Sequence, residues 1–372
     1  MRFADIRLVI GTRPEAIKLS PVAQALAAHG HAPRLVLTGQ HPGLDPREFG
    51  LGSLPADRLN CPGEEDPHAH VRKVDAAIRP LLGRGPDLLI VQGDTSSAHG
   101  AALGAFAAGV PVAHVEAGLR THDRQLPWPE EEYRTAIDAG ADLLFAPTEQ
   151  AAANLESEGV AGEVHVTGNT GIDALLSAEA QLPPLSLREG GVGHRLLVTC
   201  HRRESWGEGL ESIAQALIAL ARRGGVSIDV VLHPNPFVAA RMRELLAATP
   251  GISLIEPCRH GELIQRMRDS DLVLSDSGGI QEEAPALGVP LLVLRDKTER
   301  PEGLADGSAV LVGTSAARIV TAASRLLDDP IARAAMSRRS FPYGDGRAAR
   351  RIAAIIGDWL GRQADERKLV LG

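Results

Sequence analysis

Two successive series of short apolar runs alternate with helical stretches along the 372-residue chain. The runs are continuously rich in Val, Ile and Leu, which is typical of strands buried on both faces of a parallel sheet. Alternation of such strands with helices predicts parallel sheets that helices cover on both sides. The first series comprises DIRLVI, PRLVLT, DLLIVQ, PVAHVE, DLLFAP and EVHVTG, and the second comprises HRLLVTC, SIDVVLH, ISLIEP, LVLSD, PLLVL and AVLV.

The length of the chain suits two domains better than one, and 44% apolar residues are enough to fill two cores. A loose segment around 175–193, rich in Leu, Pro, Arg and Glu, separates the two series of strands. We therefore expect an α/β protein with two Rossmann-like, doubly wound domains that face a cleft. The expected boundaries are 1–172, 173–344 and a C-terminal helix within 345–372 that packs back on the first domain.

Composition argues against several classes of partner. Only 3% of residues are aromatic and the net charge is −8, which disfavours a nucleic-acid or acidic-membrane surface. The chain shows no secretory leader and no apolar run of membrane-spanning length, so we expect a cytoplasmic protein. Cys61, Cys200 and Cys258 lack CxxC spacing, which predicts reduced thiols. Cys200 and His201 would point to opposite faces of a strand, which argues against a catalytic thiol.

The segment SDSGGIQEE places a serine and two glycines where a buried strand passes into a helix. The backbone N–H groups of Ser277, Gly278 and Gly279 should therefore lie at a helix N-terminus, where the helix dipole favours an anion such as phosphate. Glu283 follows one turn later, like the acidic residues that accept hydrogen bonds from ribose. The alternative interpretation is a tight structural turn.

The first strand is followed by GTRPEAIK. Thr12 and Glu15 have the spacing of a capping box, which gives Glu15 a structural role. Arg13 and Lys18 are cations near a helix start, a position that suits them only beside an anion, so both are phosphate candidates; the alternative is solvated surface charge. The turn has one glycine and matches neither G-x-G-x-x-G nor a P-loop, which argues against a bound NAD or P-loop nucleotide.

Carboxylates follow two later strands of the first series. Asp94 and Glu116 would emerge at the same edge of the sheet as Arg13, because each follows the carboxyl end of a parallel strand. Ligands of such sheets bind beyond that edge. Glu130 begins a run of three glutamates after Pro129, in the first turn of a helix. Each of these acids has a structural alternative as a cap or dipole partner. Converging carboxylates are nevertheless what general acid–base chemistry requires.

The strand ends of the second series carry further cations. His201 and Arg202 are candidates for contact with a diphosphate, and His233 is either a ligand or a satisfied loop histidine. Arg300 is a donor either to phosphate or to a local carboxylate. Two Rossmann-like domains with an anion site on one and acids on the other describe an enzyme that acts on a nucleotide sugar.

At these residues the chain resembles the non-hydrolysing UDP-N-acetylglucosamine 2-epimerases, which have the two-domain fold of type B glycosyltransferases. The matching motifs run in order over nearly the whole chain, and this collinearity is more specific than any one of them. They are GTRPEAIK, TGQH, GDT, HVEAGLRT, PWPEE, TGNTGIDAL, HRRE, DSGGIQEEAPALGVP, RDKTERPEG and PYGDGRA.

The resemblance implies reversible interconversion of UDP-GlcNAc and UDP-ManNAc. Carbon 2 of the sugar has no adjacent carbonyl, so inversion requires transient oxidation or loss and return of UDP. The missing dinucleotide fingerprint favours anti elimination of UDP through a 2-acetamidoglucal. The resemblance implies a homodimer with no metal and no cofactor. The residues that it assigns to catalysis are Asp94, Glu116, Glu130 and His201, and those assigned to substrate binding are Arg13, Lys18, Arg134, Arg202, His233, Ser277, Gly278, Gly279, Glu283 and Arg300.

Other functions remain open at this stage. A hydrolysing relative would release ManNAc and UDP, and an epimerase could act on a modified sugar such as a diacetamido uronic acid. A glycosyltransferase of the same architecture would require an acceptor, and a non-catalytic sensor would not need the acids that this chain keeps. After TGQH, the proline-containing PGLDPREFG replaces a helical run that binds an activating UDP-GlcNAc in the family, so we expect weak or absent allosteric activation.

Overall fold

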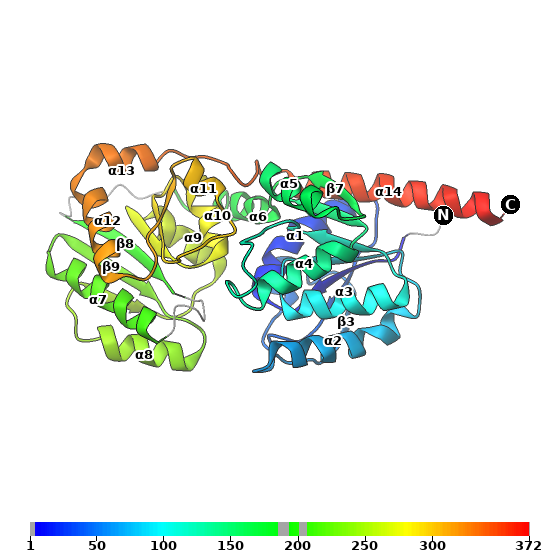
Figure 1. Ribbon diagram of the computed structural model, residues 1–372, viewed down its shortest axis with the longest axis horizontal. Coiled ribbons are helices and arrows are strands. Elements are labelled where there is room, and N and C mark those ends of the chain that lie inside the picture. Colours follow the sequence, from blue (N-terminus) through cyan, green and yellow to red (C-terminus); the bar gives the residue numbers. More distant parts are fainter. Residues whose placement is uncertain (1–3, 185–192, 201–206, 372) are drawn as a thin grey trace. The chain divides into compact units, whose positions relative to one another are not determined.

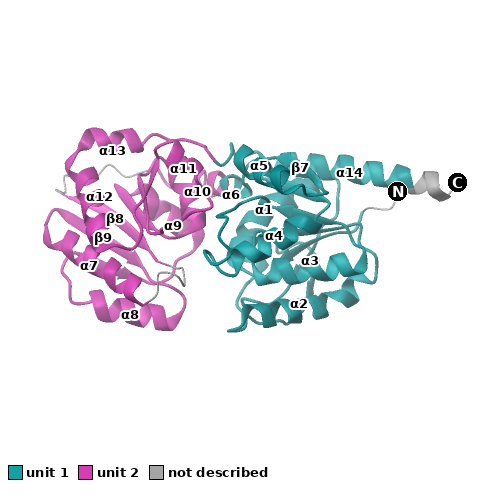
Figure 2. Ribbon diagram, viewed as in Figure 1, with its two compact units in different colours: residues 1–174, 343–372 teal, residues 175–342 magenta. Residues whose placement is uncertain are grey.

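The computed structural model describes residues 4–184, 193–200 and 207–371. The chain forms two compact units (Figure 2). Unit 1 combines residues 1–174 with 343–372, and unit 2 comprises residues 175–342. The chain therefore passes from one unit to the other twice, and each unit is described below by itself.

Unit 1 is built on a seven-stranded sheet in the order β3-β2-β1-β4-β5-β6-β7, and every pairing between neighbours is parallel. The order reverses at β1, so β1 and β4 meet at the switch point where ligands of such sheets bind. The strands are β1 (Ile6–Ile10), β2 (Arg34–Leu37), β3 (Ala56–Arg58), β4 (Leu88–Gln92), β5 (Val112–Val115), β6 (Leu143–Ala146) and β7 (Glu163–Val166).

Helices cover both faces of this sheet (Figure 1). Alternate residues of β1 divide between two cores, because successive side chains of a strand point to opposite faces. Leu8 packs with α1 and α14, whereas Val9 packs with α2, α3, α4 and α5. The elements are α1 (Arg13–Ala28), the 3₁₀ turn η1 (Pro46–Phe49), α2 (Pro67–Leu82), α3 (Ser96–Ala108), α4 (Glu130–Gly140), α5 (Glu149–Glu158), α6 (Thr170–Glu179), which continues into unit 2, and α14 (Ala348–Leu371).

Unit 2 is built on a six-stranded parallel sheet in the order β10-β9-β8-β11-β12-β13. Within the described ranges, no helix of the chain combines the length and hydropathy that a membrane crossing requires. The elements are β8 (His194–Thr199), α7 (Glu208–Arg222), β9 (Val226–Val231), α8 (Pro236–Leu246), β10 (Ile252–Ile255), α9 (His260–Arg268), β11 (Leu272–Ser275), α10 (Gly278–Leu287), β12 (Leu291–Val293), α11 (Glu302–Ala305), β13 (Ala309–Leu311), α12 (Ala316–Asp328) and α13 (Pro330–Met336).

All twelve expected apolar runs form strands, but two expectations were incomplete. The edge strand β3 was missed because its three residues carry no apolar run and lie partly exposed. The first part of the expected linker is helical, since α6 extends to Glu179. The chain passes between the two units at 174/175 and at 342/343, where the sequence analysis expected 172/173 and 344/345.

The C-terminal helix α14 packs against α1 of unit 1. Ile352, Ile356 and Trp359 recur at helical spacing and lie in one core with Leu19 of α1. At its start, Asp173 accepts hydrogen bonds from the first two backbone N–H groups of α14, at 3.2 and 2.9 Å. The last helix is therefore part of the core of unit 1.

Truncation of one side chain on the buried face of α14 should destabilise unit 1. Ile356 is fully buried, so Ile356→Ala should lower the free energy of unfolding by about 2–5 kcal/mol. Asp358→Ala, on the exposed face of the same helix, should change it by less than about 0.5 kcal/mol. Urea unfolding measures both, and hydrogen exchange in β1 assigns the loss to unit 1. Equal effects of the two substitutions would contradict the packing described.

Candidate functional site

The first turn of α1 is joined to that of α3 by Glu15. The capping box is present as expected, with Thr12 and Glu15 each bonded to the other's backbone N–H. The Glu15 carboxylate accepts from the N–H groups of Gly11 and Thr12 at 2.7 and 2.6 Å, and from the Thr95 hydroxyl at 2.5 Å. Thr95 caps α3 as well, accepting from the N–H of Ala98. The two helix starts at the switch point of the sheet are thereby held together.

Glu116 lies at the carboxyl end of β5 with its carboxylate buried among donors. Lys18 Nζ is 2.7 and 2.8 Å from the two carboxylate oxygens. The side-chain amides of Gln92 and Asn169 donate to the same carboxylate. Glu116 also has a φ of 71°, a left-handed conformation that costs a non-glycine residue about 1–3 kcal/mol. Such strain persists only where surrounding contacts over-determine it, and it is concentrated at functional sites.

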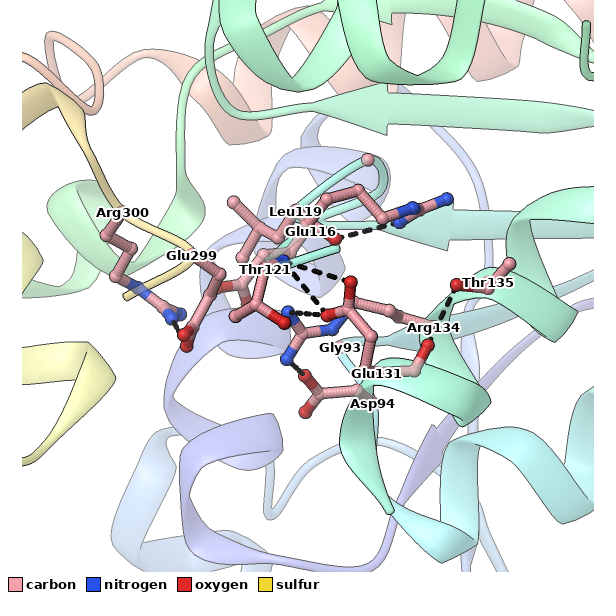
Figure 3. Close-up of polar contacts among 12 residues, drawn as sticks. Gly93, Asp94, Glu116, Leu119, Thr121, Glu131, Arg134, Thr135, Glu299 and Arg300 are labelled. Atoms are coloured by element: carbon pink, nitrogen blue, oxygen red, sulfur yellow. Dashed lines mark hydrogen bonds and ion pairs between the residues drawn. The ribbon is translucent and has the colours of Figure 1, made fainter. Parts of the chain in front are cut away.

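Asp94 follows β4 and forms an ion pair with Arg134 of α4 (Figure 3). The Arg134 side chain is 2% exposed and also contacts Glu131 at 3.2 Å. Glu131 in turn accepts from the backbone N–H groups of Thr121 and His122, both at 2.9 Å to one of its oxygens. The Asp94 carboxyl, 28% exposed, is therefore oriented by a buried cation while solvent still reaches it.

The other candidate site residues of unit 1 differ in their exposure to solvent. Glu130 is the first residue of α4, as expected, and it is half-buried. The Arg13 side chain is 52% exposed and lies 4.0 Å from Glu48. Lys18, by contrast, is buried against Glu116. The structure thus gives Lys18 a carboxylate partner that sequence reasoning did not identify, and its contact with phosphate stays a prediction.

In unit 2, the expected turn from strand to helix is formed by Ser277 and the start of α10. Ser277 is the N-cap residue, but its side chain makes no capping hydrogen bond, and its own N–H donates to Ser275 Oγ at 3.0 Å. Gly278 lies against the Arg300 guanidinium: a Cβ there would be 2.8 Å from Cζ. A cation therefore lies directly beside a helix N-terminus, and both attract an anion.

Arg300 is buried and its guanidinium is held by two glutamates of unit 2. Nε donates to Glu282 at 2.6 Å, and Nη1 donates to Glu299. Glu299 also accepts from Arg295 at 2.9 Å. Of the two interpretations left open for Arg300, the structure shows the local carboxylate partners; a phosphate contact stays a prediction.

Glu283 of α10 is paired with His260, the first residue of α9. His260 Nε2 lies 2.7 Å from Glu283 Oε1. Burial alone would lower the pKa of His260, but the charge and hydrogen bond of Glu283 prevail and raise it above the ordinary value. The carboxylate expected to bind ribose is thus oriented by a histidine that sequence reasoning missed.

The other candidates of unit 2 are less informative. His233 Nδ1 accepts from the N–H of Asn235 at 2.8 Å, as in a loop histidine. His201 and Arg202 lie outside the described residues.

All three cysteines are free, as expected, and burial raises the pKa of the Cys200 thiol well above its usual value, which opposes nucleophilic reactivity. Within the described ranges, no group of three or more His, Cys, Asp or Glu side chains is arranged to hold a metal ion.

Comparison with known proteins decides the family. The family model described as UDP-N-acetylglucosamine 2-epimerase matches residues 24–357. A Ralstonia nicotianae protein named probable UDP-N-acetylglucosamine 2-epimerase is 43% identical over 369 residues, covering 94% of this chain and 98% of its own. The chain belongs to the UDP-N-acetylglucosamine 2-epimerase family. It is therefore an enzyme of a family of isomerases.

Solved structures agree with this assignment. The UDP-GlcNAc 2-epimerase from Neisseria meningitidis, solved bound to UDP-GlcNAc, matches with a TM-score of 0.90 and 36% identity. That match covers 95% of this chain and 100% of the other. A glycotransferase of kitacinnamycin, with a TM-score of 0.62 and 12% identity over 96% of this chain and 99% of its own, shares the fold alone. The epimerase chain thus has the expected type B glycosyltransferase-like fold.

Addition of a methyl group at Gly278 should be far more costly than at Gly279. In Gly278→Ala the new Cβ would displace the Arg300 guanidinium, which two glutamates hold in place, so the free energy of unfolding should fall by about 1–3 kcal/mol. In Gly279→Ala the nearest atom, apart from its chain neighbours, is 3.9 Å away, and alanine suits a helix, so stability should be unchanged or slightly higher. Thermal unfolding compares the two; similar losses would refute the packing of Arg300 on Gly278.

The pairing of His260 with Glu283 should be visible in its titration. His260 should titrate above 6.5 in the wild-type protein. In Glu283→Gln its pKa should fall below 6.5, because burial is then unopposed. The pair accordingly contributes stability that is complete below pH 6.5 and is lost as the pH rises through the raised pKa. NMR titration of the imidazole protons measures this, with the other histidines as internal controls; an unshifted His260 in Glu283→Gln would contradict the assignment.

Proposed function

We propose that the chain interconverts UDP-GlcNAc and UDP-ManNAc by reversible anti elimination of UDP. The observation that carries this proposal is the pair of carboxylates that follow the neighbouring strands β4 and β5, namely Asp94 and Glu116, each ion-paired with a buried cation. We propose Glu130, the first residue of α4, as the third member of this catalytic set. The solved UDP-GlcNAc complex of the Neisseria meningitidis relative supports the choice of substrate. Four features of unit 2 suit a nucleoside diphosphate, namely the α10 N-terminus, Gly278, Arg300 and Glu283.

The first step is elimination of UDP from the substrate. A carboxylate of the set takes the proton from carbon 2, and the electrons of that C–H bond form the double bond between carbons 1 and 2. The bond from carbon 1 to the diphosphate oxygen breaks, and UDP leaves with that electron pair. The products are UDP and 2-acetamidoglucal, and no oxidant is consumed.

The return step inverts the centre. A proton is delivered to the opposite face of carbon 2, and the diphosphate oxygen adds again to carbon 1. Asp94 and Glu116 suit this chemistry because each carboxylate is oriented by a buried cation, Arg134 and Lys18 respectively. Ionised carboxylates also stabilise positive charge that develops on the sugar ring when the leaving group departs.

The residues of unit 2 act on the leaving group. Charge builds up on the diphosphate in the transition state, where preorganised donors contribute most. The backbone N–H groups at the start of α10 and the neighbouring Arg300 are fixed before substrate arrives, since two buried glutamates hold the guanidinium. We propose that Arg13 and His201 add to this stabilisation and that Glu283 binds the ribose.

Incubation with UDP-GlcNAc in deuterated water tests the proposal. Deuterium should appear at carbon 2 of both epimers, with traces of UDP and 2-acetamidoglucal. Asp94→Asn should reduce this exchange by about 10²–10⁴-fold, the usual contribution of an acid–base residue, while the affinity for UDP changes little. Asp75→Asn, which changes a half-buried carboxylate of α2 paired with Arg79, serves as the matched control and should exchange at the wild-type rate.

The products distinguish the competing functions. Proton NMR that showed free ManNAc and UDP as the only products would identify a hydrolysing enzyme. Turnover that required an added acceptor would identify a glycosyltransferase. Absence of deuterium at carbon 2 during epimerisation would refute the elimination mechanism.

A further inference from the structure

His114 is a fully buried residue of β5 to which the proposed reaction gives no role. Its Nδ1 lies 2.6 Å from Asp138 Oδ1, and its Nε2 lies 2.8 Å from the backbone carbonyl oxygen of Gly93. An ionised carboxylate and a carbonyl oxygen can only accept hydrogen bonds. Each ring nitrogen therefore faces a fixed group that accepts hydrogen bonds, and the Gly93 carbonyl requires its donor from Nε2.

Asp138 of α4 connects this ring to a buried cation, Arg120. Its Oδ2 accepts from the N–H of Gly118 at 3.1 Å and lies 2.8 Å from Arg120 Nη2. Arg120 is bonded in turn to Glu158 at 2.8 and 2.7 Å. Burial disfavours the Asp138 anion, yet the charges and hydrogen bonds of His114 and Arg120 lower its pKa below the ordinary value. Both oxygens of the buried Asp138 carboxylate are thus held by neighbouring groups, which fixes the position of this side chain.

The same cluster contacts the backbone beside two of the three proposed catalytic acids, Asp94 and Glu116. Gly93, whose carbonyl accepts from His114, immediately precedes Asp94. Gly118, whose N–H donates to Asp138, is two residues after the strained Glu116. Asp138 itself lies on α4, one turn beyond Arg134, the residue that pairs with Asp94.

Gly93 is the point at which this turn is easiest to deform. Its φ is 65°, and without a Cβ a glycine exchanges between backbone conformations at little cost. Rotation of the peptide that follows Gly93 would move the attachment point of Asp94. The hydrogen bond between the His114 ring and the Gly93 carbonyl opposes that rotation, because the ring is itself held by the buried Asp138 carboxylate.

We propose that the His114–Asp138 pair is a positioning element that fixes the Gly93 peptide. It thereby holds the Asp94 carboxylate in its catalytic position relative to Glu116 and Glu130. The proposal rests on the proposed function, because it assigns a purpose to the geometry of those three acids. His114 does not contact the substrate; it acts on the reaction through the backbone of the turn. A displacement of about 1 Å at a catalytic group is enough to cost about 100-fold in rate.

Two substitutions separate the two hydrogen bonds of the ring. In His114→Asn the side-chain amide nitrogen replaces Nδ1, so it keeps the donor to Asp138 and loses the donor to Gly93. In His114→Gln the amide nitrogen replaces Nε2, so it keeps the donor to Gly93 and loses the donor to Asp138. His114→Asn should lower kcat by about 100-fold with KM for UDP-GlcNAc changed less than about threefold, and His114→Gln should stay within about tenfold of wild type.

Glu158→Gln controls for loss of stability alone. This change weakens the outer ion pair of the cluster with Arg120 without altering the ring, so Tm should fall while kcat is unchanged. Equal losses of kcat in His114→Asn and His114→Gln, or losses that follow Tm across all three variants, would overturn the proposal.

The wild-type enzyme supplies a measurement that does not depend on a variant folding. Imidazole ¹⁵N NMR should show a proton on Nε2 of His114, the nitrogen that faces the Gly93 carbonyl, and a ring without a proton at Nε2 would overturn the proposal. Deuterium exchange at carbon 2 separates this failure from that of the function. Wild-type protein without exchange refutes the proposed function, whereas full exchange in His114→Asn refutes the positioning role alone.

Discussion

The buried ion pair of Lys18 with Glu116 is the interaction on which the candidate catalytic edge of unit 1 depends. A carboxylate removed from water costs several kcal/mol unless a counter-charge and hydrogen bonds replace its hydration. Here α1 supplies the counter-charge, Gln92 supplies a donor from the end of β4, and Asn169 supplies one from the residue before α6. Three segments far apart in the sequence must therefore meet at Glu116 before its strained backbone conformation is stable. The fold and the site consequently form together.

Most of the architecture follows from the sequence because buried parallel strands are recognisable as continuous runs of apolar residues. The exceptions show the limit of that signal. Strand β3 consists of Ala56, Asp57 and Arg58 at the edge of the sheet, where only one neighbour pairs with it and burial is partial, so no apolar pattern is needed. The capping box of Thr12 and Glu15 was predicted correctly because it is a local interaction, with both partners inside one helical turn.

The site was less predictable, because spacing places side chains at an edge but does not select their partners. Lys18 was a candidate for phosphate, and the structure pairs it with a carboxylate that lies 98 residues away. Arg300 was a candidate for phosphate or for a local carboxylate, and the sequence alone did not identify Glu282 as its partner. The missed residues had weak signals: Asn169 lies in TGNTG and His114 lies in HVEAG. Side-chain packing decides such pairings, and a pattern of residue types does not contain it.

The position of α14 has a consequence for synthesis of the chain. Its apolar face completes the core over α1, although α1 leaves the ribosome more than 300 residues earlier. Unit 2 is one continuous segment and contains all of its own strands, so it can fold while the last helix is still being translated. The first unit to emerge is thus the last to finish, and its exposed apolar surface during that interval is where a chaperone would bind a nascent chain.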